Sequence, residues 1–270
     1  MHDHTGGAAG TLDAVLLIPF LVAAVAYLAA AARERRGGRG WPIHRMVFAV
    51  AGLALAASGF VGPLANAHAD FTAHTLAHLL VGMVAPLLLV LSAPVTLALR
   101  TLAVVPARRL SRLLRSSPVH VLSHPVTAAL LNVGGLWLLH RTDLYATLGA
   151  IPGGHLLVMA HFLAAGYLFT AAIVPVDPSP HRARLVTRAV VLGLAAAAHG
   201  ILAKLLYIDA PAGVALADGR AGAQLLFYGG DAVDLVLIAL LGLEWYRRTG
   251  RQLARAPHAA TAQPTTGALR

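Results

Sequence analysis

The sequence contains no cysteine among its 270 residues. Disulfides, thiolate metal sites and a Cys-x-x-Cys chaperone are therefore excluded. Charge is also scarce, because only 12% of the residues are charged, whereas soluble proteins average about 25%. Hydrophobic residues make up 58% of the chain, which is typical of a protein that crosses a membrane several times. In such a protein the position of the charges matters more than the formal total of +10, so nucleic acid is not an expected partner.

Long apolar runs dominate what is present. A helix that crosses a bilayer needs about 20 mostly apolar residues, and seven stretches qualify: 11–32, 43–62, 72–98, 125–140, 155–175, 186–208 and 225–246. The sequence therefore predicts an all-α polytopic membrane protein with seven transmembrane helices in residues 11–246. We expect a short outer tail in residues 1–10 and a disordered inner tail in residues 247–270. Pro86 and Pro94 lie in the third run and predict a kink or an early end there.

The basic residues predict how the chain is oriented. With the N-terminus outside, the inner segments 33–45, 100–115, 182–188 and 247–270 hold five, five, three and five basic residues. These are 18 of the 21 arginines and lysines in the chain. Because positively charged loops stay on the inner side of the membrane, the sequence predicts an outer N-terminus and an inner C-terminus.

Histidine is in excess, since 14 histidines outnumber the 11 acidic residues. With a rise of 1.5 Å per helical residue, His78 and His161 lie about 9 Å below the outer boundaries of their runs. His199 lies about 13 Å below its boundary and Asp231 about 9 Å. Ionisable groups at such depths usually face the bundle interior. We therefore expect His78, His161 and His199 to point into one cavity.

A second tier of histidines lies nearer the outer boundary, at His74, His140 and His155. His74 and His78 are four residues apart and share a helix face. Met83 and Met159 lie close to the two tiers in sequence. Imidazole and thioether groups suit copper, and thioether favours Cu(I), but three histidines with a carboxylate would also suit zinc. Structural roles compete with both metals, because histidine can bond a backbone carbonyl and methionine can simply pack.

Residues 71–100, FTAHTLAHLLVGMVAPLLLVLSAPVTLALR, resemble the third helix of the CtaG-like cytochrome c oxidase assembly factors of bacteria, the group associated with caa-type oxidases. The resemblance continues through HPVTAALLNVGGLWLLHRTDLY (124–145), HLLVMAHFLAAGYLF (155–169) and VDPSP (176–180). It implies a multi-pass protein of the bacterial cell membrane that helps to mature the copper centres of the oxidase. Oxidase subunits, and a periplasmic copper donor, are the partners that it implies. The family histidines fall on His74, His78, His140, His155 and His161.

The leading hypothesis is a copper-binding assembly factor that holds copper at the outer face and transfers it without covalent chemistry. Its expected ligands are His74, His78, His155 and His161, with His140 and His199 next, and with Met83, Met159 and Asp231 nearby. One alternative is a seven-helix zinc hydrolase acting on lipid, with Ser58, His78, His161, His199 and Asp231 in its site. A further alternative is a bis-His haem membrane protein. The geometry of the ligands distinguishes zinc catalysis from metal transfer.

Overall fold

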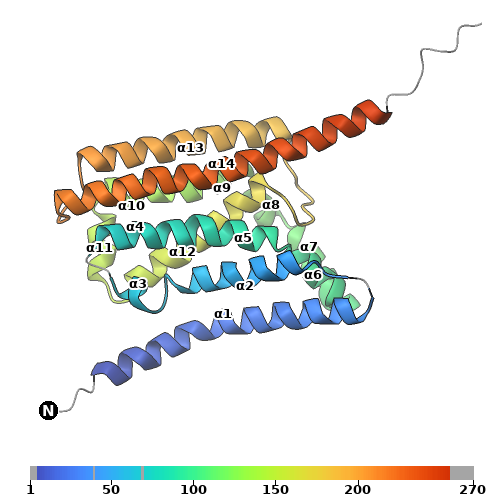
Figure 1. The fold of residues 1–270 in the computed structure, drawn as a ribbon, viewed down its shortest axis with the longest axis horizontal. Coiled ribbons are helices and arrows are strands. Elements are labelled where there is room, and N and C mark those ends of the chain that lie inside the picture. The colour runs from blue at the N-terminus through green and yellow to red at the C-terminus, as the bar shows by residue number, and fades with distance from the viewer. Residues whose placement is uncertain (1–4, 39, 68–69, 256–270) are drawn as a thin grey trace, which may run out of the picture.

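The computed structural model describes residues 5–38, 40–67 and 70–255 of the chain. Within these ranges the regular elements are all helical, which confirms the all-α part of the predicted fold. The long helices run along one axis and form a bundle (Figure 1). Helix α1 (Thr5–Arg36) begins at one end of this axis, and α14 (Leu216–Arg255) finishes at the other.

The other helical elements lie between α1 and α14 in the chain. They are α2 (Ile43–Ala57), α3 (Pro63–Asn66), α4 (Phe71–Leu79), the π-helical turn η1 (Leu80–Val84), α5 (Ala85–Leu91), α6 (Pro94–Thr101), α7 (Val104–Leu114), α8 (Ser117–Leu122), α9 (Pro125–Ala129), a second π-helical turn η2 (Leu130–Gly134), α10 (Gly135–Arg141), α11 (Leu144–Ala150), α12 (Gly154–Ile173) and α13 (Leu185–Ile208).

Five helical stretches are long and apolar enough to cross a membrane: Thr11–Arg36, Phe71–Leu91, Gly154–Ile173, Leu185–Ile208 and Leu216–Gly250. Two of the predicted runs correspond to shorter helices. The run at 43–62 contains α2, which is apolar and has 15 residues. The run at 125–140 corresponds to α9, η2 and α10, which follow one another without a gap. The chain is therefore a multi-pass membrane protein by the length and composition of its helices.

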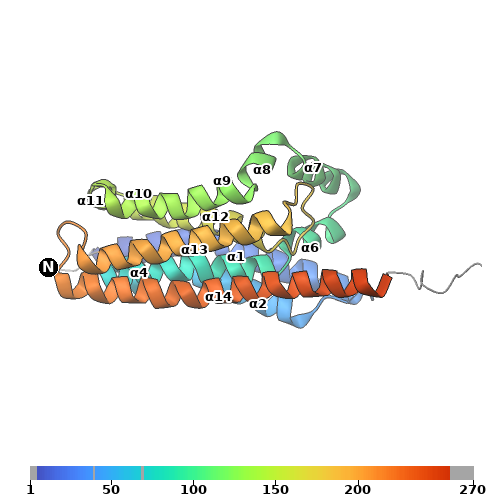
Figure 2. The same cartoon turned by 90° about the horizontal axis from the view of Figure 1, so that it is seen from above.

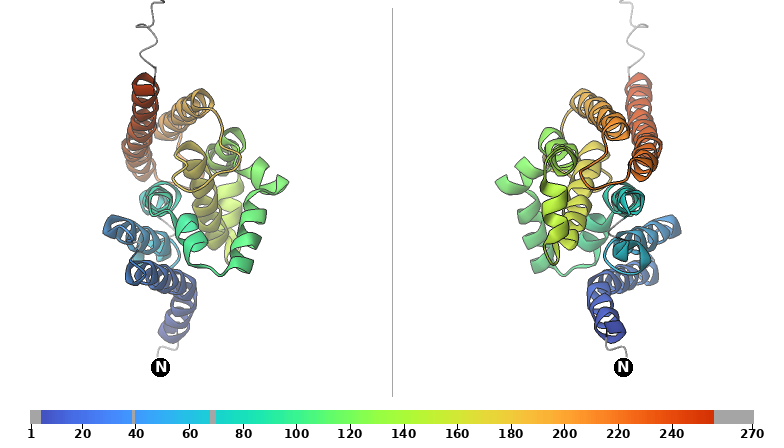
Figure 3. Two further views of the ribbon diagram at one scale, coloured as in Figure 1. Left: turned by 90° about the vertical axis from the view of Figure 1, so that its right-hand side faces the viewer. Right: turned by 90° about the vertical axis from the view of Figure 1, so that its left-hand side faces the viewer.

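Helices α4 and α5 lie at the centre of the bundle. In Figure 1, α14 lies on one side of this central helix and α2 on the other, with α1 beyond α2 and α13 beyond α14. Figure 2 shows α9, α10 and α12 in a second layer behind, and the end-on views of Figure 3 show the same division. Helix α12 packs against both η1 and α5. Residues of α4 therefore face neighbours from both layers.

The early end predicted in the third run is confirmed, and its helix is irregular near both prolines. The π-helical turn η1 precedes Pro86, which has no N–H to donate to the Gly82 carbonyl four residues earlier. Gly166 of α12 lies against this carbonyl so closely that a β-carbon at position 166 would overlap it. At Pro94 the helix stops and restarts, because α5 ends at Leu91 and Ala93 adopts a positive φ of 53°. The π-helical turn thus lies where α12 crosses the central helix most closely.

Two aspartates from distant segments cap helices at opposite ends of the central stretch. The Asp218 carboxylate, at the start of α14, accepts from the Phe71 and Thr72 amides at 2.8 and 3.0 Å and from the Thr72 hydroxyl at 2.6 Å. The Asp177 carboxylate accepts in the same way from the Thr96 amide and hydroxyl at 2.7 and 2.6 Å. These contacts fix α14 to α4 and the loop after α12 to α6.

The ends of the chain differ from the sequence prediction. Helix α1 already includes residues 5–10, and α14 continues to Arg255. Residues 247–255 are therefore helical rather than part of a disordered tail, because the apolar repeat of α14 runs directly into helix-forming residues such as Gln252, Leu253 and Ala254. The rest of the two predicted tails, residues 1–4 and 256–270, lies outside the described part of the chain.

Candidate metal site

His78 of α4 and His199 of α13 face each other inside the bundle. Their ring centroids are 6.2 Å apart, and the planes of the rings differ by 26°. Both side chains are buried, with 3% and 5% of their surface exposed. A small cavity of about 20 Å³ lies beside them, and Met83, Asn132 and Asp234 are also among the residues that line it. The expectation that His78 and His199 share an interior cavity is therefore correct.

The nitrogens of these two rings are short of hydrogen-bond partners. Among the described residues, neither Nδ1 nor Nε2 of His78 has a partner, and neither does Nε2 of His199. A buried polar group without a partner costs free energy, on the order of 1–3 kcal/mol for each group. Groups of this kind in a folded protein need an explanation, such as a ligand that is bound during function.

Two glycines make room for these rings. Gly230 of α14 lies under the His199 ring, and a β-carbon there would overlap the imidazole. Gly82 approaches His78, with 3.2 Å between an added β-carbon and the ring atoms. The two adjacent glycines of α14 thus permit close packing, since Gly229 likewise makes room for Leu79.

An outer group of rings lies nearer the end of the bundle at which α4 begins. The His74 ring centroid is 5.7 Å from that of His140 and 5.0 Å from that of Tyr145. His140 stacks on Tyr145 at 5.8 Å. The Nδ1 atom of His140 donates to the Leu136 carbonyl at 3.0 Å, so its Nε2 atom carries the free lone pair. Burial, together with the negative charges of Asp218 and Asp70, raises the pKa of the Tyr145 phenol.

Two cavities open beside the outer group. One has a volume of about 370 Å³, and His74, Tyr145 and His155 are among its lining residues. The other has a volume of about 480 Å³ and is lined in part by His140 and Tyr145. His155 itself is held in place, because its Nε2 atom donates to the Gly59 carbonyl at 2.9 Å. The outer histidines thus border open space, whereas His78 and His199 lie deeper.

His161 does not join the interior group, so the expectation that it points into the same cavity as His78 and His199 is wrong. Its side chain is exposed on the face of α12 that meets η2. The Nε2 atom donates to the Leu131 carbonyl at 3.1 Å, and the ring packs against Gly135. The Leu131 carbonyl, in the π-helical turn η2, accepts this bond in addition to one from the Gly135 amide.

The other predicted residues also divide into those that line the cavity beside His78 and those that do not. Met83 lines the cavity beside His78, whereas Met159 is fully buried in the core near Gly59. Asp234 is buried and faces the cavity, whereas Asp231 is only partly buried. The sequence signal for Asp234 was present, since it lies one turn after Asp231 on the same face of α14. No sequence pattern indicated Asn132 or Tyr145, because only the fold brings η2 and α11 close to the histidines of α4.

The positions of these side chains limit which metal and cofactor sites the chain can form. Among the described residues, no three His, Asp or Glu side chains lie close enough together to hold a metal ion as they stand. Neither the three-histidine zinc site of the hydrolase alternative nor the expected copper ligand set of His74, His78, His155 and His161 is therefore assembled in this part of the chain. Ser58 donates its hydroxyl proton to the Leu55 carbonyl. The 20 Å³ cavity beside His78 and His199 is far too small for a haem.

The chain is similar in sequence to one protein family and to several proteins of mycobacteria. Residues 25–248 match the model of the family described as cytochrome c oxidase caa3 assembly factor (Caa3_CtaG). "Uncharacterized protein ML1998" of Mycobacterium leprae (strain TN) is 37% identical over 178 residues, which are 63% of this chain and 27% of that protein. "Uncharacterized protein MT0111" of Mycobacterium tuberculosis (strain CDC 1551 / Oshkosh) is 38% identical over the same shares. The chain thus spans little more than a quarter of these curated relatives. No solved structure matches it.

Proposed function

The chain belongs to the cytochrome c oxidase caa3 assembly factor family, and from this premise we propose that it binds copper at the outer face of the bacterial cell membrane and passes it to an oxidase subunit. Copper is the cargo in this proposal, and no covalent step is needed. A periplasmic copper donor would load the site from outside. The oxidase subunit would receive the ion by ligand exchange.

The unpartnered imidazoles of His78 and His199 carry this proposal. They present three buried nitrogens without hydrogen-bond partners, and the Met83 thioether borders the same cavity. Imidazole and thioether are ligands that suit copper, and thioether favours Cu(I). An incoming ion would satisfy nitrogens that are otherwise unpaired in the core, so binding offsets a cost that the apo-protein carries.

The outer group offers a route toward this pair. His74 lies four residues before His78, on the same face of the central helix, and borders the 370 Å³ cavity with His155. His140 has a free lone pair on Nε2 and borders the second cavity. An ion could thus pass from the open outer tier, through His74, to the enclosed pair. Transfer between proteins requires that the ion exchange its ligands. With histidines at two depths, the ion can replace one imidazole ligand at a time.

The proposed outer site also requires an orientation of the chain in the membrane. We propose seven crossings, in which α2 and the α9–α10 stretch accompany the five long helices, with the N-terminus outside and the C-terminus inside. The start of α1 and the finish of α14 lie at opposite ends of the bundle, which suits an odd number of crossings. The positively charged loops then lie inside. A reporter fused after residue 270 should be active only inside; activity only outside contradicts the orientation.

The test is a Cu(I) titration of the purified protein against a competing chelator. Wild type should bind Cu(I), and His78→Leu, which replaces the imidazole by an apolar side chain, should bind it at least tenfold more weakly. His44→Leu, on the exposed surface of α2, is the matched control and should bind as wild type does. Equal affinities for wild type and His78→Leu would remove the site. If the wild type binds zinc much more tightly than Cu(I), the result would instead favour a zinc site.

A further inference from the structure

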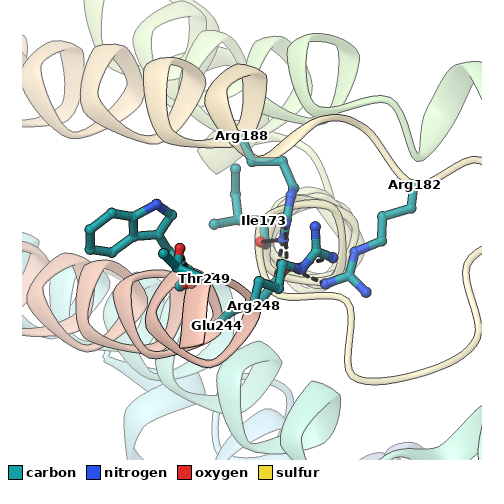
Figure 4. A network of polar contacts seen from close by, with 7 residues as sticks. Ile173, Arg182, Arg188, Glu244, Arg248 and Thr249 are labelled. Atoms are coloured by element: carbon teal, nitrogen blue, oxygen red, sulfur yellow. Dashed lines mark hydrogen bonds and ion pairs between the residues drawn. The ribbon is translucent and has the colours of Figure 1, made fainter. Parts of the chain in front are cut away.

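The opposite end of the bundle holds a cluster of arginines around one carboxylate. Oε1 of Glu244 in α14 forms ion pairs with Arg182 at 2.5 Å, with Arg188 at 2.7 Å and with Arg248 at 2.8 Å (Figure 4). Three guanidinium groups therefore meet a single negative charge. The cluster carries an excess of two positive charges, because none of the other ion pairs found in the described part of the chain involves these arginines.

Arg188 is the arginine of the cluster that holds the helices together. It is fully buried, it contacts both oxygens of Glu244, and it also donates to the Ile173 carbonyl at 2.8 Å. This geometry neutralises the carboxylate and joins α13 to α14 and to the end of α12. Arg188 and Glu244 thus form a complete pair. Arg182 and Arg248 add charge that the pair does not need.

Arg182 and Arg248 remain open to the surroundings. Their side chains are 36% and 42% exposed, respectively. Arg248 lies near the end of the membrane-spanning part of α14, which reaches Gly250, and Arg182 lies in the loop that follows α12. Both groups therefore reach the surface where a spanning helix leaves the apolar layer. Phospholipid headgroups occupy that level of a bilayer, and basic pockets between helices on the inner side bind anionic headgroups.

An apolar cavity adjoins the cluster. It has a volume of about 150 Å³ and lies between α12, the α7–α8 segment and the loop before α13, and Arg182 is among its lining residues. Leu168, Ala172 and Leu114 belong to its walls. One arginine therefore contacts both the charged cluster and an apolar recess. A molecule with a negatively charged head and a hydrocarbon chain matches this combination.

We propose that Arg182 and Arg248 bind the phosphate of an anionic phospholipid, such as phosphatidylglycerol, whose acyl chain lies against the cavity. A guanidinium can donate two parallel hydrogen bonds to a phosphate, which is why arginine is frequent in phosphate sites. The lipid phosphate supplies negative charge that Glu244 alone does not provide. The lipid then holds together the inner ends of α12, α13 and α14, at the end of the bundle away from the histidines.

The test compares lipids that differ only in headgroup charge. The full-length protein in detergent is titrated with phosphatidylglycerol or with phosphatidylcholine of the same acyl chains, and the unfolding temperature is followed. Phosphatidylglycerol should raise it and phosphatidylcholine should not. Arg248→Gln should weaken the apparent affinity for phosphatidylglycerol about tenfold, as expected for the loss of a charge-assisted hydrogen bond. Arg220→Gln, at the other end of α14 where Arg220 stacks on Tyr207, should leave it unchanged.

Two further measurements keep the result decisive. Native mass spectrometry of the wild type, after a wash that removes loosely bound lipid, should show retained phosphatidylglycerol. This measurement does not depend on the folding of any variant. Inorganic phosphate should give little stabilisation, because it lacks the chain. Equal stabilisation by both lipids, equal affinity of Arg248→Gln and wild type, or full replacement of the lipid by inorganic phosphate would overturn the proposal. Because none of these readouts involves copper, their failure is distinct from failure of the transfer function.

Discussion

The imidazole of His199 lies directly against the Cα atom of Gly230, so that the close approach of α13 and α14 fixes the position of the ring. This contact links helix packing to the proposed copper site. The His199 ring has its place because α14 presents no side chain there. Any side chain at position 230 must displace either the ring or the helix.

We therefore predict that Gly230→Ala weakens Cu(I) binding by about tenfold or more, the range seen when residues that orient a metal ligand are changed. Gly242→Ala is the matched control, since it lies on the same helix and an added β-carbon meets no atom within 4 Å. Alanine favours a helix over glycine by about 1 kcal/mol, so Gly242→Ala should be slightly more stable and bind copper normally. Chelator competition and thermal unfolding check the pair. Normal copper binding by Gly230→Ala would show that the ring position does not matter.

His161 gives a prediction that separates a structural histidine from a ligand. Its Nε2 atom donates to the Leu131 carbonyl at the π-helical turn η2. His161→Gln can keep this bond, because the glutamine amide is also a donor, so Cu(I) affinity should stay within about twofold of wild type. His161→Ala loses the bond and should cost about 1 kcal/mol of stability. A loss of affinity in His161→Gln as large as that in His78→Leu would make His161 a ligand after all.

Much of the architecture could be predicted from the sequence because its signals are local. Apolar runs indicated the helices, and the two prolines indicated where the central helix is irregular, near Pro86, and where it stops, before Pro94. The site is harder, because depth along a helix says nothing about direction around it. His78 and His161 were expected at equal depth. His78 of α4 is buried in the core, whereas His161 of α12 is exposed. That difference depends on which neighbours surround each helix.

Other residues could not have been found from local patterns. Asp177 reads as a turn residue in VDPSP, but its carboxylate caps α6, which lies about 80 positions earlier in the chain. Asp218 plays the same part for α4 from a distance of 146 positions. Asp234 differs from Asp231 only by one helical turn, and the packing of α14 on α13 decides that Asp234 lines the cavity. Such roles follow from long-range contacts.

The Asp218 cap should be measurable. Its carboxylate accepts three hydrogen bonds from Phe71 and Thr72 at the start of the helix that carries His74 and His78. Asp218→Ala should lower the free energy of unfolding by about 1–2 kcal/mol, the usual cost of losing a helix cap. Asp209→Ala removes only the exposed ion pair with Arg141 and should change it by less than about 0.5 kcal/mol. Denaturation of both variants in detergent compares them, and equal losses would contradict the capping role.

The last prediction concerns the oxidase itself. In the host membrane, His78→Leu should lower the copper content and activity of the oxidase while the variant protein remains at normal abundance. Abundance should hold because the fold depends on apolar helix packing, and removal of a buried ring without hydrogen-bond partners relieves a cost rather than adding one.

Added copper in the medium should partly restore the oxidase, since mass action compensates for a weakened carrier. His44→Leu, on the exposed face of α2, should behave as wild type with and without added copper. Metal analysis of the purified oxidase, alongside immunodetection of the variant, gives the readout. If His78→Leu and the double variant His74→Leu/His78→Leu are both abundant and the oxidase still contains its full copper, the chain assists assembly without carrying the ion through these histidines.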